Sequence, residues 1–323
     1  MIEISHLSKH FGSLKAVDDI SLSVATGEVL GFLGPNGAGK STTMKMICGF
    51  LDPDAGQVQI DGDDVRENPI AVKQRIGYLP EGAPLYGDMT TRAFLKFIAQ
   101  IRGFRGPEID QRIQQVVDKT SLHSVLDKTI ETLSKGFKRR VGLAQAIIHD
   151  PQVLILDEPT DGLDPNQKHE VRNLIRSMAQ DKIIILSTHI LEEVDAVCTR
   201  AVIISAGKLV FDGSPDTLTQ RSVLHNALSV VLEAVDSNQV CAEILSLDGV
   251  ARVNLLDQTD NRIQLQVFPD KGVLLAASFS EFCRERGWSL HGLVVERGRL
   301  DEVFRDITGD AQLDDEPVQA AGP

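Results

Sequence analysis

Eight residues near the N-terminus constrain this chain more than any other part of its sequence. Gly34-Pro-Asn-Gly-Ala-Gly-Lys-Ser41 follows a β-type run, Glu28 to Leu33, and precedes a segment, Ser41 to Phe50, whose apolar spacing predicts a helix. The segment fits the pattern G-x-x-x-x-G-K-[ST], which arises by chance in a chain of this length about once in a hundred. Glycines let successive backbone N–H groups point at one oxyanion, and the helix dipole favours the same charge. The segment therefore predicts a phosphate-binding loop.

The loop suggests a role for each of its residues. Lys40 is expected to reach the β- and γ-phosphates of a bound nucleotide, and the hydroxyl of Ser41 is expected to ligate Mg²⁺. The predicted nucleotide-binding residues in this segment are Gly34, Pro35, Asn36, Gly37, Ala38, Gly39, Lys40, Ser41 and Thr42.

Two carboxylates end a later apolar run, Val153 to Leu156. Continuous apolar runs are typical of strands buried on both faces of a parallel sheet, and ligands bind at the carboxyl ends of such strands. Asp157 is the candidate for holding Mg²⁺ through its water shell, and Glu158 is expected to face the opposite way on the pleat and to polarise the attacking water. An ordinary exposed strand end is the alternative, which the upstream phosphate loop disfavours.

A histidine ends the next apolar run. Ser187-Thr188-His189 follows Ile183 to Leu186, so it is expected at the same sheet edge. A lone histidine is more often structural, but a neutral imidazole at that edge would donate a hydrogen bond to the γ-phosphate and respond to its loss. The predicted catalytic residues are therefore Glu158, His189 and Lys40.

Composition limits the class of protein. The 323 residues favour two domains, and 42% hydrophobic with 24% charged residues is typical of globular chains. The net charge of −13 disfavours nucleic acid as a partner, and the basic run Lys135 to Arg140 is more simply interpreted as a solvated helix start. Four scattered cysteines indicate neither a zinc site nor a disulfide framework and fit a reducing cytosol. Without a leader-like start or an apolar span, membrane contact is expected to need a partner protein.

The pattern along the chain predicts an inserted helical lobe and a second domain. Helical spacing dominates between Thr90 and His149. From Leu228 the predicted order is strand, helix, strand, strand, helix, strand, which is the ferredoxin-like arrangement, and a last helix is expected over Leu300 to Ile307. The expected domains are an α/β domain over 1–222 with a helical subdomain over about 85–150, a small α+β domain over 225–308, and a flexible acidic tail over 310–323.

These elements, in this order, resemble the ABC ATPase family over roughly residues 1–220. The most specific match is Leu133-Ser-Lys-Gly-Phe-Lys-Arg-Arg-Val-Gly-Leu-Ala-Gln145, which is similar to the family's Leu-Ser-Gly-Gly-Gln signature segment. The resemblance implies a P-loop NTPase fold with a RecA-like sheet core and a helical subdomain. It also implies ATP hydrolysis in a head-to-tail dimer, a homodimer or a heterodimer with a similar ATPase, in which Ser134 and Gly136 contact the partner's nucleotide. Lys135 and Phe137 depart from the signature, where Gly and Gln are usual.

The same resemblance implies further site residues. Asp161-Gly-Leu-Asp164 is similar to the D-loop, so Asp164 is expected to cross to the partner's site, and Phe11 stands where an aromatic ring stacks on adenine. Glu81 occupies the place of the Q-loop glutamine, and its carboxylate is expected to ligate Mg²⁺ together with Ser41 and Asp157. Residues 82–89 would line the groove that receives a permease.

Glu81 and the Lys-Gly-Phe signature resemble the subgroup that serves ABC-2 type permeases, including gliding-motility, sodium-extrusion and drug-export ATPases. The resemblance implies an ATP- and Mg²⁺-dependent subunit that powers export through a separately encoded permease, cytoplasmic and peripheral on the inner (plasma) membrane. A soluble ABC ATPase that remodels a ribosome, DNA or a protein complex is the alternative. Those families usually carry two cassettes or a long coiled-coil insertion, and neither is found in this sequence. An effector-sensing role for the C-terminal domain has no supporting motif.

Overall fold

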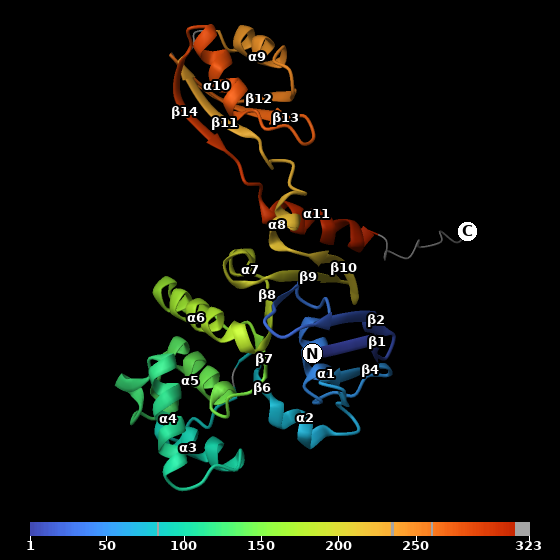
Figure 1. Cartoon of the computed structure of the whole chain (residues 1–323), viewed down its shortest axis with the longest axis vertical. Helices are drawn as coiled ribbons and strands as arrows, with labels where there is room; N and C mark the ends of the chain where they lie inside the picture. The colour runs from blue at the N-terminus through green and yellow to red at the C-terminus, as the bar shows by residue number, and fades with distance from the viewer. Residues whose placement is uncertain (83, 234–235, 260, 314–323) are drawn as a thin grey trace, which may run out of the picture. The chain divides into compact units, whose positions relative to one another are not determined.

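The structure is a computed structural model that describes residues 1–82, 84–233, 236–259 and 261–313 (Figure 1). The chain divides into two compact units. Unit 1 comprises Met1–Pro215 together with the segment that begins at Ile307, and unit 2 comprises Asp216–Asp306. Among the described residues, no helix is long and apolar enough to cross a membrane.

A six-stranded sheet forms the centre of unit 1, in the order β10-β9-β3-β8-β7-β6. Its strands are β3 (Val29–Leu33), β6 (Ile76–Leu79), β7 (Val153–Asp157), β8 (Ile183–Thr188), β9 (Arg200–Ser205) and β10 (Lys208–Gly213). All neighbours are parallel except β10, which runs antiparallel to β9. Every residue of β3, β7 and β8 is buried, which confirms the interpretation of the apolar runs as strands covered on both faces.

The two faces of this sheet pack into two different cores. Val153 and Ile155 of β7 belong to a core shared with α1 (Lys40–Ile47) and with a second, antiparallel sheet of order β2-β1-β4-β5. Leu154 and Leu156 face the helical side instead. The strands of the second sheet are β1 (Ile2–Phe11), β2 (Leu14–Val24), β4 (Ala55–Ile60) and β5 (Asp63–Asp64), and α2 (Pro69–Arg75) follows it. The sheet core is thus sandwiched between the antiparallel sheet with α1 and a group of helices.

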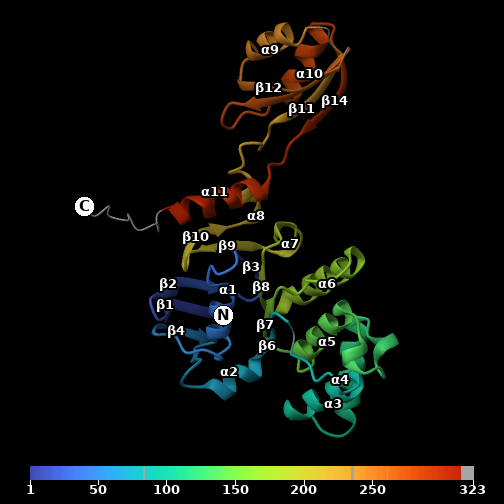
Figure 2. The same ribbon diagram turned by 180° about the vertical axis from the view of Figure 1, so that it is seen from behind.

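The helical side contains the predicted lobe. Its elements are α3 (Thr91–Ile101), α4 (Pro107–Thr120), η1 (His123–Val125), η2 (Ile130–Thr132) and α5 (Lys135–Ile147). They share one core with α6 (Pro165–Met178), which continues into the 3₁₀ turn η3 (Ala179–Asp181), and with α7 (Leu191–Val197), which follows β8. Phe94 is fully buried there, and Tyr86 packs edge-on against it and against Phe97. Both views show α3, α4 and α5 as one group of helices (Figures 1 and 2).

Unit 2 has the element order strand, helix, strand, strand, helix, strand. After α8 (Pro215–Thr219) come β11 (Leu228–Glu233), α9 (Ser237–Leu245), β12 (Val250–Thr259), β13 (Arg262–Pro269), α10 (Ala276–Glu285) and β14 (Ser289–Val295). The strands form an antiparallel sheet of order β12-β13-β11-β14, the ferredoxin-like connectivity. Alternate residues of β11 and β13 share a core with Ile244 of α9 and Phe279 of α10.

The last helix, α11 (Leu300–Leu313), is longer than the predicted Leu300 to Ile307 helix. The predicted flexible tail over 310–323 therefore begins inside a helix, and its residues 314–323 lie outside the described part of the chain. Regular apolar spacing stops near Ile307, which is why the sequence pattern ended the helix early.

Candidate active site

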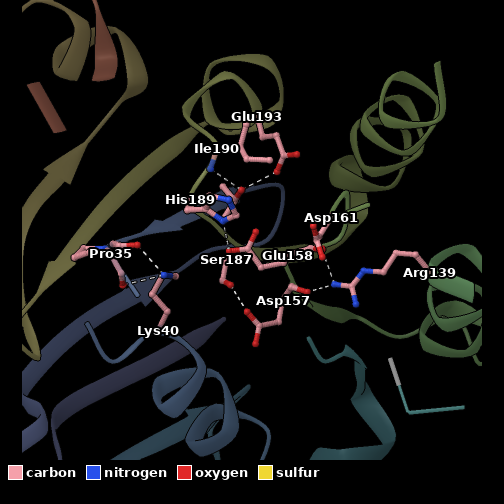
Figure 3. Close-up of polar contacts among 12 residues, drawn as sticks. Pro35, Lys40, Arg139, Asp157, Glu158, Asp161, Ser187, His189, Ile190 and Glu193 are labelled. Carbon is pink, nitrogen blue, oxygen red and sulfur yellow. Dashed lines mark hydrogen bonds and ion pairs between the residues drawn. The ribbon is translucent and has the colours of Figure 1, made fainter. Parts of the chain in front are cut away.

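The phosphate loop and the ends of two neighbouring strands converge at one edge of the central sheet (Figure 3). Because β3, β7 and β8 are parallel neighbours, the segments that follow them leave the sheet at the same edge. A cavity of about 270 Å³ opens there. It is lined by Asn36, Gly37, Gly39, Lys40, Ser41, Thr42, Glu81, Asp157 and Glu158. The structure thus brings most of the sequence-predicted loop residues together with the predicted carboxylates.

Lys40 is the first residue of α1, and its side chain folds back over the loop. Its Nζ donates hydrogen bonds to the carbonyl oxygens of Gly34 at 2.7 Å and Pro35 at 3.1 Å. Burial lowers the pKa of Lys40, and the charges of Glu158, Asp157 and Glu81 oppose that shift. The ammonium therefore lies at the cavity wall, hydrogen-bonded to two neutral carbonyl oxygens. A phosphate oxygen, which is charged, is able to replace them as the acceptor.

Asp157 and Glu158 adopt different environments although they are adjacent in the chain. Asp157 ends β7, is only 2% exposed, and accepts a hydrogen bond from the hydroxyl of Ser187. Glu158 lies outside the strand with φ of 52° and donates its backbone N–H to the carbonyl of Ser187 at 3.0 Å. The prediction that Glu158 continues the pleat is therefore wrong. A left-handed turn, rather than strand alternation, separates the two side chains.

The turn brings Glu158 to His189. Glu158 Oε1 lies 2.8 Å from His189 Nδ1, and its buried Oε2 has no hydrogen-bond partner among the described residues. The His189 ring is itself 57% exposed. Thr188 supports the segment by accepting the N–H of Ile190 at 3.0 Å and by donating to Glu193 Oε2 at 2.8 Å. Glu193, which no sequence pattern had indicated, is buried, and burial raises its pKa.

Arg139 is the second residue that the sequence analysis missed. It lies in α5, is 6% exposed, and donates to the carbonyl oxygen of Pro80 at 2.8 Å. It also donates to the carbonyl oxygens of Glu158 at 2.6 Å and of Asp157 (Figure 3). The interpretation of the run Lys135 to Arg140 as a solvated helix start is wrong for its last two residues. Arg140 is also buried, and its guanidinium stacks 4.4 Å from the ring centroid of Phe137. The one sequence feature that indicates the burial of Arg139 and Arg140 is that the apolar residues Val141 and Leu143 closely follow them.

Eight of the predicted site residues are not among the described residues that line the cavity. Gly34, Pro35 and Ala38 belong to the loop itself, and His189 reaches the cavity only through its contact with Glu158. The remaining four, Phe11, Ser134, Gly136 and Asp164, lie on other elements. Phe11 ends β1 and is 50% exposed, with Lys9 Nζ 5.9 Å from its ring centroid.

The other three lie at the starts of α5 and α6. Ser134 is the N-cap of α5, and its hydroxyl accepts the N–H of Phe137 at 3.3 Å. Gly136 is buried in the first turn of α5. Asp164 is the N-cap of α6 and accepts the N–H of Gln167 at 2.9 Å. Within one chain, therefore, these residues have local helix-starting roles and no contact with the phosphate loop cavity.

Comparison with known proteins identifies the family. A family model described as ABC transporter matches residues 17–161. The probable multidrug ABC transporter ATP-binding protein YbhF of Escherichia coli K12 is 38% identical over 223 residues, which are 69% of this chain but only 38% of that relative. The daunorubicin resistance ATP-binding protein DrrA3 of Streptomyces coeruleorubidus is 33% identical over 310 residues, 96% of both chains.

A solved structure agrees with these matches. The structure of an ATP-binding subunit of an ABC transporter superposes with a TM-score of 0.64 and 30% identity, covering 68% of this chain and 92% of the other. The similarity therefore extends from the loop motif to the arrangement of unit 1. The chain belongs to the family of ABC transporter ATP-binding proteins.

Proposed function

We propose that this chain is the ATP-binding and ATP-hydrolysing subunit of an ABC-2 type transporter that exports its substrate through a separately encoded permease. The observation that carries the proposal is the cavity of about 270 Å³ in which Lys40, Ser41, Asp157 and Glu158 meet. A cationic loop at a helix N-terminus facing two carboxylates is suited to phosphoryl transfer to water. The names of YbhF and DrrA3, which refer to multidrug transport and daunorubicin resistance, support export.

Mg²⁺ is the cofactor that this cavity needs. Its walls carry three carboxylates, Glu81, Asp157 and Glu158, against the single ammonium of Lys40. A nucleoside triphosphate alone would be repelled by that excess of negative charge, and a divalent cation offsets it. The donors fit, because the Ser41 hydroxyl and the carboxylates of Asp157 and Glu81 are the oxygen ligands that Mg²⁺ prefers. When bound, the ion neutralises charge on the β- and γ-phosphates.

Glu158 is the group that orients the attacking water in this proposal. His189 holds Oε1 at 2.8 Å, which leaves the buried Oε2 as the free acceptor for a proton of that water. Lys40 exchanges the carbonyls of Gly34 and Pro35 for phosphate oxygens when ATP enters. Positioning and charge stabilisation supply most of the rate enhancement in phosphoryl transfer, so this fixed geometry is the functional core.

A second chain completes each site. Among the described residues, the cavity wall contains none of Ser134, Gly136 and Asp164. Ser134 begins α5, so the unpaired backbone N–H groups of its first turn form an anion-binding surface at a different place in the same chain. In a head-to-tail homodimer, or a heterodimer with a similar ATPase, this surface meets the partner's γ-phosphate. Phe11 stacks on the adenine ring at the exposed end of β1.

The permease docks in a second and larger cavity. A hollow of about 740 Å³ lies between the sheet core and the helical side of unit 1. It is lined by Cys48, Phe50, Ile70, Lys73, Gln74, Ile76, Tyr78, Ile98, Ile101, Arg102, Phe104, Gln145, Ala146 and His149. Its walls are mainly apolar, and two of the lining residues, Lys73 and Arg102, are cationic. Such a surface suits a short amphipathic segment. The chain is then peripheral on the cytoplasmic face of the inner (plasma) membrane.

The docking role predicted from the sequence for residues 82–89 stays a prediction. Leu85 and Met89 pack against the helical core, whereas Tyr86 remains 55% exposed. Among the described residues of this segment, none lines the larger cavity. We therefore assign docking mainly to the cavity and leave Tyr86 as the part of the segment that a permease reaches.

Turnover of the Glu158→Gln variant tests the hydrolytic part of the proposal. At saturating Mg-ATP we expect turnover to fall by about 10²-fold or more, and ATP to trap a stable dimer in size-exclusion chromatography. Glu192→Gln is the matched control, since that side chain is 87% exposed. A Glu158→Gln variant that still hydrolyses ATP, or that stays monomeric with ATP bound, contradicts the assignment of Glu158 or of the sandwich dimer.

Co-purification from membranes tests the transport part. The wild-type chain should co-purify with an integral membrane protein, and Ile101→Asp, a change in the exposed wall of the larger cavity, should abolish that association without changing basal turnover. Val223→Asp, at an equally exposed apolar position, is the control. Co-purification with ribosomes, DNA or a soluble protein complex instead would favour the non-transport alternative.

A further inference from the structure

Arg139 joins three segments of unit 1 through one buried guanidinium. The residue lies in the second turn of α5, five residues after the Ser134 N-cap. One terminal nitrogen donates to the carbonyl of Pro80 at 2.8 Å. The other donates to the carbonyls of Glu158 at 2.6 Å and of Asp157. The planar, many-donor guanidinium fixes such contacts in angle as well as in distance, so these carbonyls are held relative to α5.

The three acceptors belong to the segments that carry the cavity carboxylates. Pro80 directly precedes Glu81, and the other two carbonyls are those of Asp157 and Glu158 themselves. Both segments line the 270 Å³ cavity, whereas Arg139 does not. Arg139 therefore acts on the cavity only through the backbone that presents the carboxylates.

Arg139 is one of several restraints on the turn at Glu158. The turn has φ of 52°, a conformation that side-chain-bearing residues adopt only at a cost of about 1–2 kcal/mol. Its N–H is held by the carbonyl of Ser187 at 3.0 Å, and its carbonyl accepts from Asp161 N–H at 3.1 Å as well as from Arg139. The restraint from Arg139 is the one that comes from the helical side, because Ser187 and Asp161 belong to β8 and to the segment after β7.

The burial of Arg139 does not by itself stabilise the fold. Removing a guanidinium from water costs several kcal/mol, and replacing buried charged groups by apolar side chains is often neutral or stabilising. Its acceptors are neutral carbonyls, and within the described part of the chain neither Nη atom forms an ion pair with a carboxylate. The Nε atom is buried with no hydrogen-bond partner among the described residues. Burial lowers the pKa of Arg139, whereas the charges of Asp157, Asp161, Glu158 and Glu81 raise it and so offset part of this penalty. Its hydrogen bonds are made to the backbone that presents these carboxylates, so the contact fixes their position as well as supporting the fold.

We propose that Arg139 is a positioning residue that transmits the orientation of α5 to the Glu158 carboxylate and to the Glu81 segment. This inference rests on the proposed function, because it concerns hydrolysis at that same site. The segment Ser134 to Gly136, which meets the partner's nucleotide in the proposed dimer, begins the helix that carries Arg139. A rigid rotation of α5 on dimer closure therefore moves the guanidinium and, with it, the carbonyls of Pro80, Asp157 and Glu158. Hydrolysis then depends on closure through a direct mechanical contact.

Three variants of the full-length chain separate positioning from support. Arg139→Met removes the donors and keeps an apolar stem, and Arg139→Lys keeps the charge and donors without the planar fork. Arg200→Met is the matched control. Arg200 donates to Asp212 Oδ2 at 2.6 Å and to the carbonyl of Ser23 at 2.9 Å, and it lies on β9, away from α5. For each variant, kcat, KM, melting temperature and equilibrium binding of a fluorescent ATP analogue are measured.

We expect Arg139→Met to lower kcat by about 10²-fold, the effect of a misplacement of about 1 Å in a catalytic group. KM and analogue binding should stay within about threefold of wild type, since Lys40 and the loop are untouched. Arg139→Lys should restore part of kcat, and Arg200→Met should lower the melting temperature while leaving kcat unchanged.

Two results would overturn the inference. The first is an Arg139→Met variant with near wild-type kcat. The second is a loss of kcat that comes with an equal loss of analogue binding, or that Arg139→Lys does not relieve, because a merely structural role gives that pattern. The wild type and Glu158→Gln, run in parallel, report on the proposed function itself. Absence of hydrolysis by the wild type would refute that function, whereas a sensitive Glu158→Gln beside an insensitive Arg139→Met would refute only the role of Arg139.

Discussion

Gly39 offers the sharpest stability test of the phosphate loop. It precedes α1 with φ of 109°, a region that L side chains rarely adopt. A Cβ added there would lie inside 3.0 Å of the Ala16 carbonyl oxygen and 3.1 Å from Ile204 Cδ1. The first neighbour is backbone of β2, in a residue that is itself buried, so it is unable to turn away as a flexible side chain would. We predict that Gly39→Ala forces the loop or β2 to shift.

Gly37 provides the matched control within the same loop. Its φ is 83°, and a Cβ added there would meet nothing within 4 Å. Gly37→Ala therefore carries only the conformational penalty of about 1–2 kcal/mol. Gly39→Ala carries a similar penalty plus that of overpacking, about 1–3 kcal/mol. The free energy of unfolding should thus fall by about 2–5 kcal/mol in Gly39→Ala.

Thermal unfolding and nucleotide binding measure this difference. A change of 1 kcal/mol shifts the melting temperature of a unit this size by about 2–4 °C. Gly37→Ala should therefore lower it by about 2–8 °C, and Gly39→Ala by roughly twice as much, with loss of ATP-analogue binding because the loop N–H groups no longer converge. Equal shifts in the two variants would refute the reasoning, since the close approach to Ala16 would then contribute nothing.

Two further predictions concern stability elsewhere in unit 1. Burial lowers the pKa of His149 from 6.5 to about 4, with Arg102 adding to the effect, so its neutral form stabilises the fold fully above pH 6.5 and that contribution is lost as pH falls toward 4. His149→Gln should flatten the urea-unfolding profile over this range by up to about 3 kcal/mol, and an unchanged slope would contradict the assignment. Asp212→Asn removes the paired carboxylate of Arg200 and should lower the free energy of unfolding by about 1 kcal/mol at low salt, and by less at about 1 M salt. A salt-independent loss would argue against an ion pair.

The convergence at the sheet edge was predictable because it follows from topology. Apolar runs at Val153 to Leu156 and Ile183 to Leu186 predicted strands covered on both faces, and parallel neighbours end at a common edge. The structure places Asp157, Glu158 and Ser187 there as a consequence. A continuous apolar run in each short segment was sufficient, since no contact between distant side chains had to be predicted.

β1 shows where the pattern fails. Its pairing with β2 contains register shifts between Ile4 and Leu7 and again before Lys9 and before His10. Each irregularity interrupts the alternation of apolar and polar residues on which strand prediction depends. The segment therefore carried no clear strand signal, although Ile2, Ile4 and Leu7 are fully or almost fully buried.

Arg139 was missed for a different reason. Its acceptors lie 59, 18 and 19 residues away in the chain, and all three are backbone carbonyls that no residue type reveals. A basic residue in the second turn of a helix is more often solvated, so the local pattern favoured the wrong interpretation. The packing of α5 against β6 and beside the end of β7 buries the side chain, and these contacts are visible only once the three elements are placed.

The separation of the Asp157 and Glu158 side chains was predicted correctly, but for the wrong structural reason. Strand alternation and a left-handed turn both send adjacent side chains in different directions, so the sequence pattern predicted a separation but assigned it to the wrong backbone geometry. The difference matters for function. A side chain on a pleat is fixed by the whole sheet. Glu158 is instead fixed by Asp161 of its own segment, by Ser187 and His189 at the end of β8 and directly after it, and by Arg139 of α5. The carboxylate proposed to activate water is therefore the one whose position other elements are most able to change. Asp157 also accepts from Arg139 through its carbonyl, but it ends β7 and its carboxylate is bonded to Ser187 of the neighbouring strand.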